Sequence, residues 1–184
     1  GDQIWMIGLP FQKNSKIDPR ITLSASSYLE CIHDLITGRP PQIDLDLELD
    51  VQSFVRSAIA NNLINSAHDI SDGGLAIALA ECSIASNLGI NCDLQISDQR
   101  IDHLLFAESG SRVIVSVDST KVVELQRLLN EHNSMKRNYL YKLGTVSKGN
   151  NFIISYNGSK IIDISISHLK HSYENAIKRR VSNV

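Results

Sequence analysis

The segment SAHDISDGGLAIALAE, residues 66–81, constrains the fold of this chain more than any other stretch. A polar run with two adjacent glycines leads directly into a helix rich in alanine and leucine, although the 184 residues include only 10 glycines. The pattern predicts a short strand over 63–70, a turn at Gly73 and Gly74, and a helix over 74–87. Such a turn presents backbone N–H groups with no Cβ in the way, which suits a phosphate or another anion.

A second interpretation of the turn needs no ligand. Ser71 or Asp72 can cap the helix, while the glycines permit close packing of the helix. The carboxylates of Asp69 and Asp72 also oppose direct phosphate binding unless Mg²⁺ bridges the two groups. The segment contains neither the G-K-[ST] of a Walker loop nor the G-x-G-x-x-G of a dinucleotide site. From spacing alone, both interpretations stay open.

Length and charge limit the class of protein. A chain of 184 residues and 20.4 kDa predicts a single domain over 1–184, and the formal charge of −2 indicates neither nucleic acid nor a membrane surface as a partner. No apolar run reaches the roughly 18–20 residues of a membrane span. Three cysteines without a C-x-x-C pair favour reduced thiols and a cytoplasmic location. Because GDQIWMIGLP starts inside a predicted strand, we expect a fragment of a longer polypeptide.

The remaining periodicity predicts an α/β (α+β) fold, with a mixed β-sheet packed against helices. A helix is expected over 43–62 with an uncertain start, since the first half alternates like a strand and the second half follows helical spacing. Asn157-Gly158 predicts a tight hairpin between the last two strands. The other expected strands are 3–9, 90–96, 112–117, 139–146, 151–156 and 160–166. The other expected helices are 26–37, 100–109 (or a turn), 119–132 with Ser119 or Thr120 as its N-cap, and 168–180.

Several segments together resemble one enzyme family. SAHDISDGGLAIALAE is similar to a segment in the C-terminal domain of the phosphoribosylformylglycinamidine synthase family. The resemblance covers nearly the whole chain, because further matching segments follow in the family's order: GDQIWMIG, SSYLECIHDLITGRPPQIDLDLE, LLFAESGSRVIVSV, LGTV and LKHSYENAI. It implies the fold of an AIR synthetase C-terminal-like domain, and specifically the second of two such domains in the synthase.

The resemblance also implies an activity for the whole enzyme. The implied enzyme is an ATP-dependent, amidine-forming C–N ligase of de novo purine biosynthesis, which converts formylglycinamide ribonucleotide to the amidine. ATP and Mg²⁺ are implied as cofactors, and the implied partners are N-terminal ATP-binding domains and a glutaminase that supplies ammonia. Because the family's catalytic groups lie in those N-terminal domains, no catalytic or metal-binding residue is carried onto this chain, and we expect the fragment alone to be inactive.

Two elements are implied as ligand-facing. One comprises Asp69, Ser71, Asp72, Gly73 and Gly74. The other comprises Glu108, Ser109 and Arg112, which resemble the family's E-S-Q-x-R element. Gly110 stands where that element has glutamine, so a side-chain amide is missing. Arg112 could bind phosphate or pair with Glu108.

Alternatives remain beside this family. Gly110 favours a degenerate structural module or an auxiliary nucleotide-binding module, and the D-I-S-D-G stretch also resembles thiamine-phosphate kinases. His168 and His171 lie at metal-binding spacing without an evident third ligand, and we interpret His68 as a hydrogen-bonded structural residue. Trp5 is expected in the core or in interdomain packing.

Overall fold

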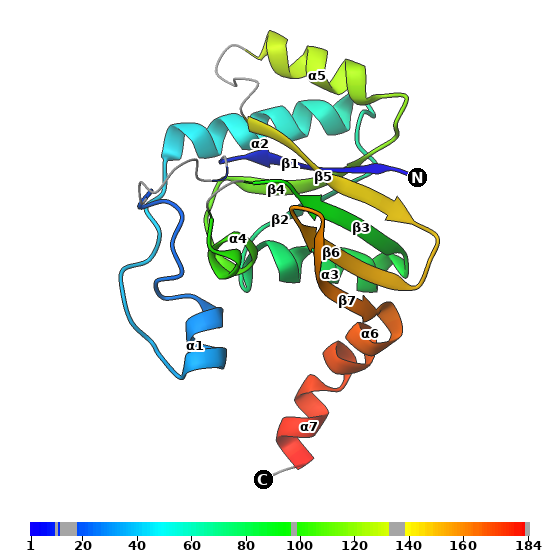
Figure 1. The fold of residues 1–184 in the computed structure, drawn as a ribbon. Helices are drawn as coiled ribbons and strands as arrows, with labels where there is room; N and C mark the ends of the chain where they lie inside the picture. The colour runs from blue at the N-terminus through cyan, green and yellow to red at the C-terminus, as the bar shows by residue number, and fades with distance from the viewer. Residues whose placement is uncertain (10, 12–17, 97–98, 133–138, 183–184) are drawn as a thin grey trace.

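A computed structural model describes residues 1–9, 11, 18–96, 99–132 and 139–182. Strand β1 (Gln3–Gly8) runs through the middle of the sheet and is buried on both faces (Figure 1). Ile4 and Met6 contribute to one hydrophobic core, whereas Trp5 and Ile7 contribute to the other. This alternation follows from the two-residue period of a strand. It explains why QIWMIG reads as a nearly continuous apolar run and confirms the core position of Trp5.

Within the described residues the sheet has seven strands, in the order β2-β4-β1-β5-β3-β6-β7. Neighbouring strands are antiparallel except for β3 and β6, which are parallel, so the mixed sheet expected from the sequence is confirmed. β2 lies at one edge and pairs only with β4 among the described strands. The other strands are β2 (Ser66–Asp69), β3 (Gly89–Leu94), β4 (Arg112–Val117), β5 (Leu140–Ser147), β6 (Asn151–Tyr156) and β7 (Ser159–Ser165).

Helices cover both faces of the sheet and make three layers (Figure 1). α2 (Leu45–Ala60) and α5 (Val122–Glu131) pack on the face of Trp5 and Ile7. α3 (Gly74–Ser86) and α4 (Ile101–Phe106) pack on the opposite face. α3 is the more deeply placed, because its first two turns are buried except for Ile77, which is 42% exposed.

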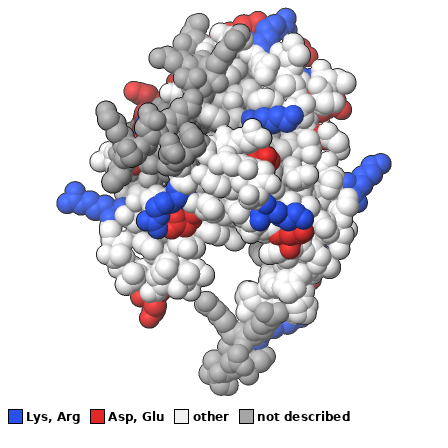
Figure 2. Space-filling view, in the orientation of Figure 1, with Lys and Arg blue, Asp and Glu red and all other residues white. Residues whose placement is uncertain are grey.

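Two helices project from this body. α1 (Ser27–His33) buries none of its residues, and α6 (Ile166–Glu174) continues into α7 (Ala176–Ser182). Figure 1 shows α1 and α7 on the same side of the molecule, and Figure 2 shows an opening between the two projections. Apolar side chains on both remain exposed, including Ile32 at 64% and Ile177 at 78%.

The helix expected over 43–62 is confirmed, and it begins at Leu45. Asp44 caps α2 by accepting the Leu47 amide at 3.1 Å. Leu47 and Val51 are buried and lie one turn apart, whereas Leu45 and Leu49 face solvent. The alternation in the sequence arises because charged residues separate the leucines, and it does not indicate a strand.

Other boundaries differ from the expected ones for local reasons. Helix 26–37 stops at His33 because Asp34 takes a left-handed conformation with φ 53°. The strand expected over 63–70 begins only at Ser66, since the Leu63 amide still bonds Ala58 O at 2.9 Å. The single helix expected over 168–180 is two helices separated at Asn175.

Two turn and cap expectations have opposite outcomes. Asn157 and Gly158 both have positive φ, 48° and 78°, which confirms the hairpin between β6 and β7. The expected caps Ser119 or Thr120 for α5 are wrong, because Lys121 occupies the cap position without a side-chain bond. Over the described residues, no helix is both long and apolar enough to cross a membrane.

Candidate functional site

The glycine turn lies at the buried end of α3, where this helix meets α4. Gly73 caps α3 with φ 78°, and the Gly74 amide bonds Ser71 O at 3.0 Å. Neither Ser71 nor Asp72 caps the helix with its side chain, so that detail of the expectation is wrong. Gly74 has φ 72°, and a Cβ there would lie 2.7 Å from backbone atoms of Phe106. The second glycine is therefore required by its own backbone conformation and by the approach of α4.

Glu108 supplies the cap that α3 lacks. Its Oε1 accepts the Gly73 amide at 2.8 Å and the Ser27 amide at 2.8 Å. The two amides belong to the first turns of α3 and α1, where backbone donors have no partner within their own helix. One carboxylate oxygen thus joins two helix starts and places its negative charge against the positive ends of both helix dipoles.

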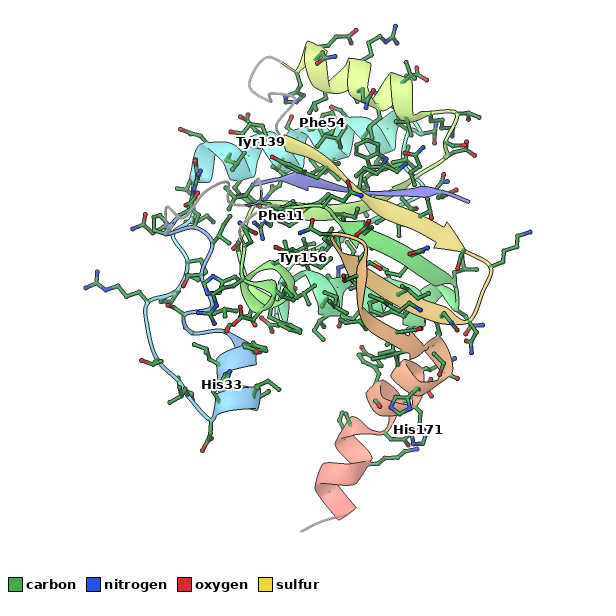
Figure 3. All side chains as sticks on the ribbon, viewed as in Figure 1. Phe11, His33, Phe54, Tyr139, Tyr156 and His171 are labelled. Atoms are coloured by element: carbon green, nitrogen blue, oxygen red, sulfur yellow. The ribbon has the colours of Figure 1, made fainter. Side chains whose placement is uncertain are left out.

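Aromatic packing supports the same junction. The Tyr28 ring of α1 stacks on the Phe106 ring of α4, with centroids 4.6 Å apart and planes 11° apart. His33 packs edge-on against Tyr28, and Figure 3 shows it on α1, away from the sheet. Three helices therefore meet around Glu108, and this contact is where the otherwise exposed α1 is attached to the body.

The loop between α4 and β4 is fixed at both ends. Ser111 has φ 57°, and its hydroxyl donates to Glu48 Oε2 of α2 at 2.8 Å. Ser109 is fully buried, and its Oγ has no hydrogen-bond partner within the described residues. Gly110 is exposed, and a Cβ built on it would meet nothing within 4 Å. Packing therefore does not explain why glycine stands at position 110.

Arg112 is buried beneath the loop, at 3% exposure. Its Nε donates to Leu9 O at 3.1 Å, and its guanidinium carbon lies 5.5 Å from the centre of the Phe11 ring. Burial lowers the pKa of Arg112 to about 10, while the charge of Asp18 acts in the opposite direction. The possible pairing with Glu108 is not among the ion pairs of the described residues, and Glu108 instead binds backbone amides.

The implied site residues thus separate into two groups. Asp69, Ser71 and Asp72 are exposed on the surface beside the turn. Ser109 and Arg112 are buried, so a ligand at the surface of the turn does not reach them. The structure brings together Gly73 and Glu108, which are 35 residues apart. Ser27 donates its amide to Glu108, and Glu48 accepts the Ser111 hydroxyl. No local sequence signal identifies either residue.

The histidines singled out in the sequence have ordinary surroundings. The Nδ1 of His68 lies 2.6 Å from Asp69 O, and its Nε2 lies 3.3 Å from Glu81 Oε2. His168 and His171 lie on α6, and the described part of the chain contains no group of three His, Cys, Asp or Glu able to hold a metal ion. On the face drawn in Figure 2, acidic and basic side chains are scattered and form no single patch.

Fold and site together define an α/β domain in which Glu108 of the same domain accepts the backbone amide of the glycine turn. The family comparison gives this class a name. The chain belongs to the family described as AIR synthase related protein, C-terminal domain, which matches residues 1–157.

Curated relatives in this family are synthase subunits. The chain is 48% identical over 183 residues to phosphoribosylformylglycinamidine synthase subunit PurL of Prochlorococcus marinus, with 98% of this chain and 23% of that protein aligned. It is 40% identical over 184 residues to the same subunit of Nostoc punctiforme, with 99% and 22% aligned. The chain therefore spans about a quarter of the length of these relatives.

Solved structures show the same fold. Phosphoribosylformylglycinamidine synthase II from Thermotoga maritima superposes with a TM-score of 0.66 at 16% identity, over 92% of this chain and 26% of that one. The HypE–HypF complex gives a TM-score of 0.54 at 17% identity, over 90% of this chain and 52% of the matched chain. At these identities the likeness concerns the fold alone, and it confirms the expected AIR synthetase C-terminal-like architecture.

Proposed function

We propose that residues 1–184 form a single C-terminal domain of a phosphoribosylformylglycinamidine synthase, and that this domain supports the enzyme's structure without supplying a catalytic residue. The similarity to synthase subunits over 98% of the chain supports the assignment to this enzyme. The relatives named above do not favour a thiamine-phosphate kinase. Gly110 supports an assignment to the second C-terminal copy, because it removes the amide expected of a substrate-binding copy.

The two hydrogen bonds that Glu108 accepts are the observation that supports a structural role for this domain. An open anion site needs backbone donors that a ligand can reach, but the Gly73 amide already donates to a carboxylate of the same domain. A phosphate at that position would have to displace a negatively charged group. The turn therefore serves to join α3, α4 and α1.

The complete enzyme would be an ATP- and glutamine-dependent ligase that forms the amidine from formylglycinamide ribonucleotide. Solved structures of T. maritima PurL are described as complexes with ATP, ADP and FGAR, and one structure is of PurLQS. We propose that the complete enzyme binds ATP with Mg²⁺ on its phosphates. We also propose that it contains N-terminal ATP-binding domains and receives ammonia from a glutaminase. A cytoplasmic location agrees with three free cysteines.

Auxiliary nucleotide binding is the second candidate function. The observation that favours it is the exposure of Asp69, Ser71 and Asp72 at one corner of the domain. Carboxylate and hydroxyl oxygens suit Mg²⁺, so a nucleotide there would be held through its metal ion and not through the glycine amides. Asp72→Asn should then weaken Mg²⁺–nucleotide binding while leaving the melting temperature unchanged.

Release of ADP in the presence of formylglycinamide ribonucleotide, ATP, Mg²⁺ and glutamine or ammonia tests the main proposal. The complete polypeptide should turn over, and residues 1–184 alone should stay at background. Turnover by the isolated residues would show that they contain catalytic groups. Absence of turnover by the complete polypeptide would contradict the assignment to this enzyme.

A further inference from the structure

A cavity of about 840 Å³ lies beside the edge strand β2, away from the glycine turn. Its walls come from β2, from the second half of α3, from the neighbouring strands and from one side chain of α6. The volume is within the range of about 300–1,000 Å³ that small-molecule sites occupy. Gly73, Gly74 and Glu108 are not among the described residues that line it, so it is separate from the site above.

Most of the lining is apolar, but one part carries acceptors. Leu79, Ile90 and Ile114 form apolar walls, and the Tyr173 ring of α6 adds an aromatic surface. Among the described lining residues the charged groups are Asp2 and Glu81, and none is a lysine or arginine. The charge of the lining therefore favours a cation over a phosphate or carboxylate ligand. The aromatic ring suits a cation as well.

The contact between His68 and Glu81 specifies where a cation would bind. A carbonyl oxygen only accepts, so the His68 Nδ1 hydrogen is donated to Asp69 O at 2.6 Å. Its Nε2 lies 3.3 Å from Glu81 Oε2, so the ring and the carboxylate lie side by side in the lining. A primary ammonium carries three N–H donors and a positive charge, which suit the Glu81 carboxylate and the ring beside it. Both side chains line the cavity, and their exposed fractions of 32% and 38% leave them accessible.

Ser83 provides a second polar group in the same lining. It lies two residues after Glu81 on α3, and its hydroxyl is buried without a hydrogen-bond partner in the described residues. A buried hydroxyl without a partner is costly. A ligand that reaches this hydroxyl with a donor or an acceptor would remove this cost.

We propose that this cavity binds a small molecule with an apolar, ring-sized body and one cationic nitrogen, with the nitrogen held by Glu81 and His68. The proposal does not rest on the synthase assignment, since it uses only the cavity and its lining. Cys82 also lines the cavity and provides a chemical reporter at its wall.

Three probes of nearly equal size and different charge test the proposal: benzylamine, benzyl alcohol and benzoate. We expect benzylamine to bind the 184-residue chain about threefold to fivefold more tightly than benzyl alcohol in an NMR titration, and benzoate to bind most weakly. Glu81→Gln should remove this preference. The matched control Glu131→Gln should retain it, because Glu131 lies on α5, on the opposite face of the sheet.

Alkylation of Cys82, followed by peptide mass spectrometry, places the probe in the cavity. Benzylamine should slow this alkylation in the wild type, and benzoate at the same concentration should not. Equal protection by both probes, or the same preference in Glu81→Gln, would overturn the proposal. Protection of Cys82 that rises with protein concentration alone would show that a second copy of the chain covers the cavity. That result would also overturn the proposal.

Discussion

The Gly73 amide donates a hydrogen bond of 2.8 Å to Glu108 Oε1, and this oxygen also accepts the Ser27 amide. Both donors lie at helix starts, and Glu108 itself is half-buried. Loss of this carboxylate should therefore destabilise the domain. Glu108→Ala should lower the free energy of unfolding by about 2–4 kcal/mol, because two backbone donors lose their acceptor.

Glu108→Gln provides the matched comparison, since it keeps an acceptor oxygen at the same reach. It should cost less than half as much as Glu108→Ala in urea unfolding. Glu124→Ala on the surface of α5 should be neutral within about 0.5 kcal/mol. Equal stability of the alanine variant and the wild type would contradict the structural role of Glu108.

Gly110 should tolerate a side chain. Its φ is not positive, and a Cβ there would meet nothing within 4 Å. Gly110→Gln should therefore change the free energy of unfolding by no more than about 0.5 kcal/mol. A large loss of stability would mean that the backbone at this position needs glycine after all.

Cys92 should make the stability fall at high pH. Burial raises the pKa of this thiol from 9.0 to about 12 in the folded protein. The unfolded chain loses the proton first, so the stabilisation is complete below pH 9 and decreases as the pH rises from 9 towards 12. Urea unfolding across that interval should show a contribution of up to about 1.4 kcal/mol per pH unit. Cys92→Ala should abolish this contribution, and an unchanged slope in that variant would contradict the assignment.

Arg112→Lys should reduce stability without affecting nucleotide binding. Lysine cannot reproduce both the bond from Nε to Leu9 O and the contact with the Phe11 ring, and the loss should be about 1–3 kcal/mol. Because Arg112 is only 3% exposed, the affinity of the complete enzyme for ATP should change by less than about twofold. Arg127→Lys on α5 is the control, since that side chain is 70% exposed. A loss of affinity with unchanged stability would instead place Arg112 at a ligand.

The regular elements were accessible from the sequence because their signals are local. The β6–β7 hairpin follows from Asn157-Gly158, and the strand β1 follows from its apolar run. The role of Glu108 was not accessible, because its partners are 81 and 35 residues away and are backbone amides, which have no side-chain signature. The strand order was also beyond local pattern, since the parallel pairing of β3 with β6 joins segments that are distant in the chain.

Gly74 provides the most direct test of the claim that the turn serves the fold. Its φ of 72° and the 2.7 Å approach of the Phe106 backbone leave no room for a methyl group. Melting of the ligand-free protein and calorimetric titration of the complete polypeptide with Mg²⁺–ATP should be compared for the wild type and Gly74→Ala, with the titration below both melting temperatures. The account predicts a ligand-free protein destabilised by about 2 kcal/mol or more, with ATP affinity unchanged. An unchanged melting temperature with ATP affinity lowered tenfold or more would contradict it.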